Sequence, residues 1–143
     1  MPNANELISY ESDVTPVTPF TVTATLTSAA AATPVVLIPA ANVLPGKKVY
    51  VNGFRATVNG GTLWATTANV YIQDTNGTPV DFFTIAVSAL TANAFVTTGT
   101  SGVTNGAAYT LGTGGTASAG LQLAANANGT GSNLVVTVHG VIQ

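Results

Sequence analysis

The sequence predicts an all-β protein: an antiparallel β-sandwich, a jelly roll of about eight strands, with an extended N-terminal arm. Apolar and polar residues alternate with a period of two along many short runs, which is the pattern of half-buried strands. Thr and Val dominate these runs, and both residues fit a pleated surface. Clusters of Gly, Asn, Asp and Pro separate the runs, as turns require. Evenly spaced short strands of this kind are typical of sandwiches and jelly rolls.

The extended arm is expected over residues 1–19, and the jelly-roll domain over residues 20–143. Residues 1–19 hold three of the five acidic residues and end in "VTPVTP", whose prolines favour an extended backbone. Two interpretations of the arm are equally supported. It is either a loose terminus or a segment that crosses onto a neighbouring subunit. In the second case its apolar contacts would be Leu7, Ile8 and Tyr10.

The strands are expected in a regular succession after the arm. The run "FTVTATLT" alternates strictly, with Phe20 and Leu26 on one face and threonines on the other. Further strands are expected at 35–38, 48–58, 62–73, 80–89, 94–98, 119–125 and 133–142. Turns are expected at "NGGT" (59–62) and at Asn76–Gly77, a strong hairpin signal. The glycine-rich stretch 99–120 is expected to form long loops around one short strand.

Two of the expected strands are apolar on both faces. Phe82 and Phe83 are adjacent, so in a regular strand they point in opposite directions. The last strand carries Val135 and Val141 on one side, with His139, and further valines on the other. We interpret these outer apolar residues as covered by another subunit. The residues predicted at an oligomer interface are therefore Phe82, Val135, His139 and Val141.

All the basic residues lie in one short window, "PGKKVYVNGFR", as Lys47, Lys48 and Arg55. With a net charge of −2 the chain has no general attraction for nucleic acid, whose binding depends on neutralising phosphates. A β-bulge near Asn52–Gly53 is expected, because the inward residues change parity there. The bulge would place Arg55 and Lys48 on the outer side, where they can orient the protein against an acidic protein partner.

Enzymatic chemistry has little support in the sequence. His139 is the single histidine, there is no cysteine, and no G-x-S-x-G motif supplies a nucleophile. A calcium loop at Asp74–Asp81 lacks the further acidic ligands that an EF-hand loop requires. No glycine motif for phosphate binding is present. We therefore predict no catalytic residues, no metal and no cofactor.

Charged residues make up only 6% of the chain, against roughly 25% in typical soluble domains. Small neutral residues replace them, which favours a subunit whose surface is largely covered by other protein. No apolar stretch is long enough to span a membrane, since prolines interrupt the best one at 29–44. The first residues do not read as a secretory signal, so synthesis in a cytoplasm is expected.

The succession "VVLIPA…PGKKVYVNGFRATVNGGT" and the ending "GSNLVVTVHGVIQ" resemble small bacteriophage virion proteins with a TNF-like jelly-roll fold. The resemblance covers about residues 34–143 and consists of strand and turn patterns. It implies a capsid decoration (cement) protein, usually a homotrimer. Such a protein would sit on the outer surface of the capsid and bind the major capsid protein.

An alternative is a phage tail or fibre module that recognises carbohydrate, and an exposed Trp64 or Tyr71 beside Asn and Asp would favour it. A surface-layer or pilus subunit is a further, nonviral alternative.

Overall fold

The protein is described by a computed structural model that covers residues 16–65 and 69–143. Leu7, Ile8 and Tyr10, the predicted contact residues of the arm, lie outside the described residues. The strands are β1 (Thr18–Leu26), β2 (Val35–Ile38), β3 (Val49–Ala65), β4 (Val70–Asp74), β5 (Asp81–Ile85), β6 (Phe95–Thr97), β7 (Val103–Asn105), β8 (Leu121–Ala125) and β9 (Thr130–Ile142). The helical segments are η1 (Ser28–Ala30), η2 (Ala40–Asn42), η3 (Val87–Ala89) and α2 (Ala107–Thr110).

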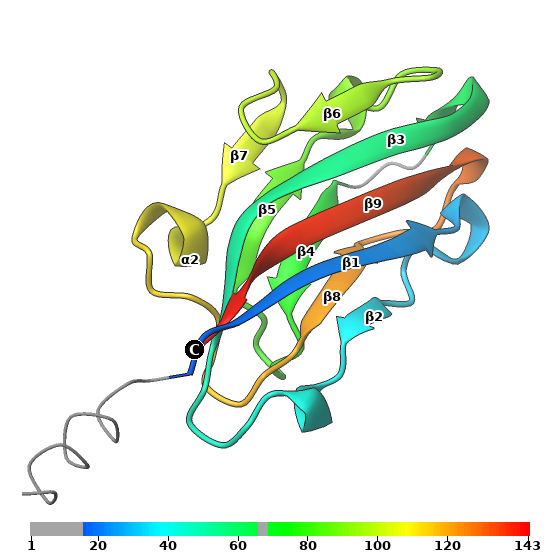
Figure 1. The fold of residues 1–143 in the computed structure, drawn as a ribbon. Helices are drawn as coiled ribbons and strands as arrows, with labels where there is room; N and C mark the ends of the chain where they lie inside the picture. The colour runs from blue at the N-terminus through cyan, green and yellow to red at the C-terminus, as the bar shows by residue number, and fades with distance from the viewer. Residues whose placement is uncertain (1–15, 66–68) are drawn as a thin grey trace, which may run out of the picture.

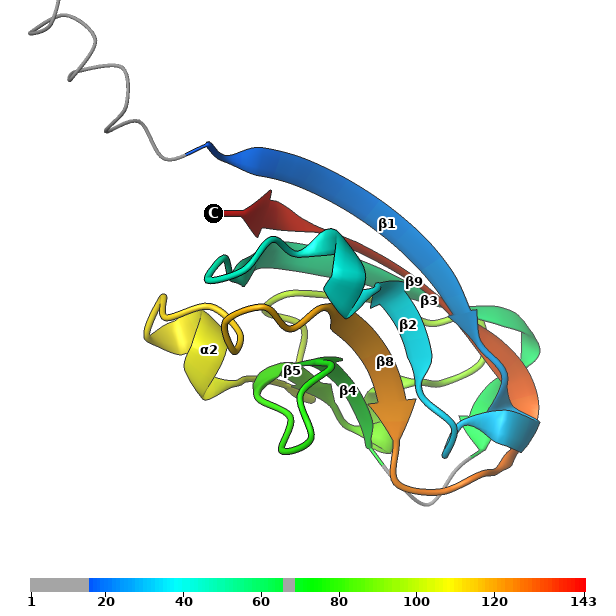
Figure 2. The ribbon, with the colours of Figure 1, turned by 90° about the horizontal axis from the view of Figure 1, so that it is seen from below.

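The described strands form two packed antiparallel sheets (Figures 1 and 2), as the sequence predicts. The four-stranded sheet has the order β1-β9-β3-β6, and the five-stranded sheet has the order β2-β8-β4-β5-β7. If β7 is set aside, the first strand pairs with the last, the second with the next to last, and so inward to the hairpin β4–β5. Strands paired in this nested order form one long hairpin that is wrapped into two sheets, which is the connectivity of a jelly roll. The short strand β7 is added at the edge beside β5.

The β1 strand begins earlier than the sequence predicts, because Thr18 and Pro19 already pair with Ile142 and Val141 of β9. The strand that the sequence predicts from Phe20 therefore starts at Thr18. Pro19 is tolerated because β1 is an edge strand, where a missing backbone donor need not break a ladder on both sides. Burial along β1 alternates as predicted: the threonines are exposed, and the strand ends with Leu26 fully buried.

The long strand β3 confirms the predicted bulge and corrects a predicted turn. The register against β9 shifts between Val51 and Gly53, so that Val51 and Phe54 both face the core. The segment "NGGT" (59–62), expected to be a turn between two strands, lies inside β3. Here β3 has three more residues than β9 between paired positions, and Gly60 has a φ of +133°. The extra residues loop out without ending the strand, because glycine permits that backbone conformation.

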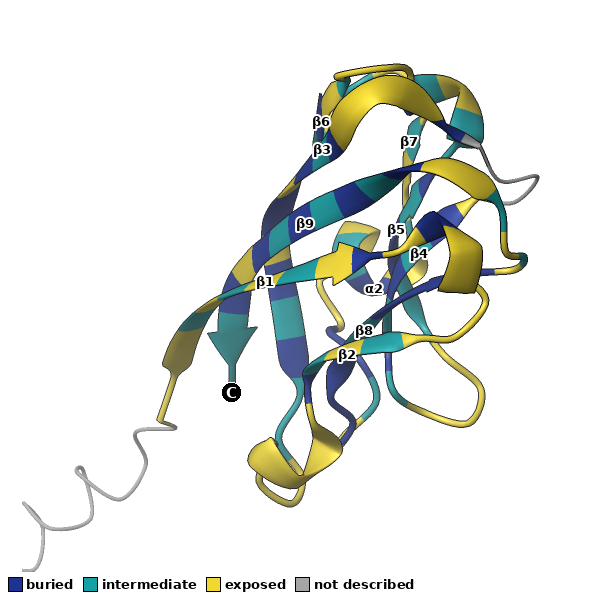
Figure 3. Ribbon diagram, turned by 90° about the vertical axis from the view of Figure 1, so that its right-hand side faces the viewer, coloured by how far each residue is buried: buried dark blue, intermediate teal, exposed yellow. Residues whose placement is uncertain are grey.

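The core lies between the sheets, and the alternation of buried and half-buried residues is visible along β9 (Figure 3). The prediction that Phe82 or Phe83 leaves the core is wrong, since both are fully buried. The reason is a second bulge: Ile72 pairs with Phe83 and Gln73 with Asp81, which leaves Phe82 as the extra residue of β5. A bulge breaks strict alternation, so adjacent residues can both be buried. Phe82 thus has no exposed surface for a second subunit.

Candidate functional site

The outer face of the four-stranded sheet is built from alternate residues that the strand register sets in rows. The central row runs Thr23, Thr137, Arg55 and Thr97 across β1, β9, β3 and β6. The next row runs Thr25, Val135, Thr57 and Phe95 across the same strands. Side chains opposite each other on neighbouring strands lie about 5 Å apart, so these rows form one continuous surface. It consists mainly of neutral, short side chains.

Arg55 is the one Lys, Arg, Asp or Glu residue in these rows, and its partner is an aromatic ring. Its guanidinium carbon lies 4.8 Å from the centroid of the Phe95 ring. Such stacking stabilises by about 0.5–1 kcal/mol at exposed sites. Phe95 is 55% exposed, so the pair presents an apolar ring and a cation together at the surface. An arginine that stacks in this way keeps N–H donors directed to the side, where a partner's carboxylate can accept them.

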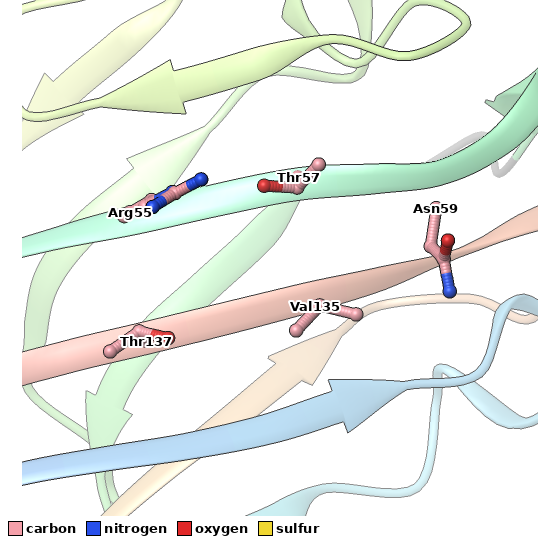
Figure 4. Close-up of a pocket in the computed structure, with 5 residues that line it drawn as sticks. All are labelled: Arg55, Thr57, Asn59, Val135 and Thr137. Atoms are coloured by element: carbon pink, nitrogen blue, oxygen red, sulfur yellow. The ribbon is translucent and has the colours of Figure 1, made fainter.

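An open depression runs along this face between β3 and β9 (Figure 4). Its lining residues are Arg55, Thr57, Asn59, Val135 and Thr137. On the β1 side the hydroxyls of Thr23 and Thr137 are hydrogen-bonded at 2.8 Å. None of these groups is a nucleophile with an activating base beside it, and the arrangement suits contact with another protein surface better than bond-making chemistry.

The predicted interface residues of β9 share this face, whereas Phe82 does not. Val135 and Val141 are half-buried and His139 is exposed, while the intervening valines face the core. His139 pairs with Gly53, and a Cβ built on Gly53 would lie 3.1 Å from the imidazole Cε1. The missing side chain of Gly53 therefore makes the space that the His139 ring uses.

The three basic residues do not form one cluster. The Lys48 ammonium donates a hydrogen bond of 3.3 Å to the carbonyl oxygen of Thr113, in the loop that follows α2. Lys47 lines a separate depression with exposed apolar Leu44, at the end of the sandwich where β1 begins. Arg55 lies on β3, seven residues after Lys48, which directly precedes the strand; this is roughly 20 Å of extended chain at 3.3 Å per residue. Of the three, Arg55 is the one that lies in the two rows described above, whereas Lys48 pairs with Gln143 at the far end of the same side of the sheet.

The edge of β1 is open. Within the described residues β1 pairs only with β9, through nine consecutive residue pairs without a bulge. Its sequence, "TPFTVTATL", has no charged residue, and its one proline lies near the start. Long uncharged edge strands tend to pair with further strands unless something covers them. The edge therefore adds a second surface suited to protein contact.

The acidic residues of the β4–β5 hairpin have a structural explanation. Asp74 is fully buried, and its Oδ1 accepts hydrogen bonds from the backbone N–H groups of Asn76 (3.2 Å) and Val80 (3.0 Å). Its Oδ2 accepts one from Thr116 (2.7 Å). The carboxylate thus fixes the turn predicted at Asn76–Gly77 and ties it to the loop after α2. Burial, together with the charge of Asp74, raises the pKa of Asp81 above its ordinary value of 3.8.

The two aromatic residues singled out for carbohydrate recognition lie in different surroundings. Trp64 is fully buried, whereas Tyr71 is half-buried on the outer face of the five-stranded sheet. The described residues contain no group of three or more His, Cys, Asp or Glu that could hold a metal ion. Among their helices none has the length and apolar character needed to cross a membrane.

Comparison with known proteins gave no match to a family model, to a curated protein or to a solved structure.

Sequence reasoning missed Phe95 and the open edge of β1. Phe95 precedes the buried Val96, so alternation alone could have placed it outside; its position under Arg55 depends on the β3–β6 pairing. The role of Gly53 follows from the same kind of long-range pairing with β9. No local pattern reports which strand becomes an edge.

Proposed function

We propose that the protein is a structural subunit of a particle, a decoration (cement) protein that binds an assembled bacteriophage capsid. The observation that carries the proposal is the outer face of the four-stranded sheet, with its rows of Thr and Val and its single Arg55–Phe95 pair. Fully desolvated protein contacts favour neutral side chains with aromatic and Arg anchors, and disfavour other charges. The low charge of the chain and its resemblance to phage virion proteins support the same class.

The arm and the β1 edge suggest how neighbours would be bridged. The described chain begins at the end of the sandwich where β9 stops, since Thr18 pairs with Ile142 (Figure 1). Fifteen residues can span at most about 50 Å, which is enough to cross a neighbouring small domain. That end also exposes Val17 and Leu44, at 52% and 68%. An arm that adds a strand to an open edge would bind by backbone hydrogen bonds.

Binding of this kind stabilises a shell by mass action, because the protein binds the assembled lattice and not its dissociated subunits. The partners proposed are the major capsid protein and further copies of this chain, as a homotrimer. In this proposal Arg55 would meet an acidic group of the capsid surface.

The test is co-sedimentation of the purified protein with particles that lack it. We expect binding to intact shells, no binding to dissociated capsid subunits, and a trimer by light scattering. Deleting residues 2–15 should reduce occupancy, and unchanged occupancy would remove the arm from the proposal. Absence of binding to intact shells would overturn the proposed function itself.

A further inference from the structure

A second depression lies on the outer face of the five-stranded sheet, on the opposite side of the sandwich. It is shallow and open to solvent, with a volume of about 360 Å³. The residues that matter for its chemistry are Pro34, Tyr71, Gln73, Asp81, Ala124 and Asn126. They come from β4, β5, β8 and the segments that flank β2 and β8, so a sheet supports most of the site.

The hollow has a simple cause in the register. Tyr71 of β4 pairs with Ala124 of β8 and with Thr84 of β5, so a phenol ring stands beside a methyl group. Pro34, before β2, forms the opposite apolar wall. Ala124 is 8% exposed and lines the hollow together with the half-buried Tyr71 ring. An accessible aromatic side beside an apolar floor is a surface on which a flat ligand can stack.

Polar groups lie next to this wall. Gln73 is on the same face of β4 as Tyr71, two residues on, and it pairs with Asp81 across to β5. Asn126 follows the end of β8. Within the described part of the chain, the side chains of Gln73, Asp81 and Asn126 make no hydrogen bond. Two amides and a carboxyl therefore direct free donors and acceptors toward one hollow.

An aromatic ring together with two amides and one carboxyl group excludes several ligand classes. A purely apolar ligand would bury these three polar side chains without partners, at a cost of about 1–3 kcal/mol each. A metal ion needs several oxygen ligands, but Asp81 is the one carboxylate here, because both oxygens of Asp74 accept backbone N–H groups. An anion would meet the charge of Asp81 in a chain of net charge −2.

We propose that this depression binds a neutral saccharide, whose apolar ring face stacks on Tyr71 while its hydroxyls bond to Gln73, Asp81 and Asn126. A pyranose ring has this dual character, with C–H groups on its faces and hydroxyls at its edge. The carboxylate accepts from hydroxyl donors, and the two amides both donate and accept. The site does not depend on the face of the four-stranded sheet or on the proposed capsid binding.

The experiment is a titration of the isotopically labelled full chain with soluble neutral hexose and N-acetylhexosamine oligosaccharides, followed by amide NMR shifts. We expect millimolar or tighter binding that shifts the resonances of β4, the end of β8 and Asp81. Tyr71→Ala should raise Kd by about tenfold, and Tyr71→Phe should keep it within about threefold, because the ring remains. Ala124→Gln should abolish binding, because it fills the hollow without removing a polar contact.

Phe95→Ala is the matched control, since it removes an exposed aromatic ring from the opposite sheet. Its Kd should equal that of the wild type. The amide spectrum of each variant verifies folding, and Asp81→Ala, which removes the acceptor oxygens, provides a second loss of contact if Tyr71→Ala unfolds. Three results would each overturn the proposal: no shift with any neutral saccharide, wild-type binding by both Tyr71→Ala and Ala124→Gln, or tighter binding of uronate-containing saccharides.

Discussion

Replacing Asp74 with Ala tests the role given to the most deeply buried charge in the described chain. Three backbone N–H groups, at 3.2, 3.0 and 2.7 Å, would lose their acceptor. Asn76 is exposed, so its N–H can bind water instead. The other two donors, of Val80 and Thr116, are partly buried, and each costs about 1–3 kcal/mol when left unsatisfied. We expect a loss of about 3–4 kcal/mol, a large share of the usual 5–15 kcal/mol of a domain.

The assay is urea unfolding at neutral pH. If the dependence of the unfolding free energy on urea concentration is the same in all variants, a shift in the unfolding midpoint reports a change in stability. Asp74→Asn should fall between wild type and Asp74→Ala, because one amide oxygen can still accept. Asp81→Ala is the control: this acid makes no hydrogen bond in the described chain, and its raised pKa means that the carboxylate is unfavourable in the folded state at neutral pH, so its removal should cause no loss of stability. A loss below about 1 kcal/mol for Asp74→Ala would refute the assigned role.

Three further outcomes follow from the packing. Phe82→Ala should lower the free energy of unfolding by about 3–5 kcal/mol and leave the oligomeric state unchanged in light scattering. If the variant instead kept wild-type stability and lost its oligomer, Phe82 would belong to a subunit interface. Asp81→Asn should remove a pH effect seen in urea midpoints. The raised pKa of Asp81 means that the folded state holds this proton more tightly than the unfolded state does. The free energy of unfolding of the wild type should therefore fall, relative to that of Asp81→Asn, as the pH rises from below 3.8 toward neutral. A rise over the same pH range would contradict this. Gly53→Ala puts a Cβ 3.1 Å from both the His139 ring and the Thr98 hydroxyl, so it should destabilise by about 1 kcal/mol, and adding His139→Ala should recover part of the loss; an additive double mutant would exclude the His139 contact.

The fold was largely predictable because it depends on local patterns. The alternation in "FTVTATLT" gave β1, and the change of inward parity around Asn52–Gly53 gave the bulge in β3. The errors share one physical origin. "NGGT" looks like a turn but is held inside β3, and Phe82 looks like an outer residue but sits in a bulge of β5. In both places pairing with a distant strand decides the outcome.

The surfaces were less predictable than the fold. Val135, His139 and Val141 could be assigned to one outer face from the sequence, because they lie on a single strand. The rows that join them to Arg55 and Phe95 depend on the order of strands in the sheet. Likewise, Tyr71 becomes part of a hollow because β8 places Ala124 beside it. The composition of the chain does not indicate that Ala124 is the neighbour of Tyr71.

Particle occupancy of Val135→Lys, compared with that of Thr104→Lys, decides whether the outer face of the four-stranded sheet contacts the capsid. Val135 lies between Thr25 and Thr57 on the outer face of the four-stranded sheet, whereas Thr104 is exposed on β7 of the other sheet. A lysine in a desolvated protein contact is strongly unfavourable, so Val135→Lys should lower the apparent affinity at least about tenfold. Thr104→Lys should bind like the wild type. Equal, undiminished occupancy of both variants would contradict the assignment of this face as the contact surface.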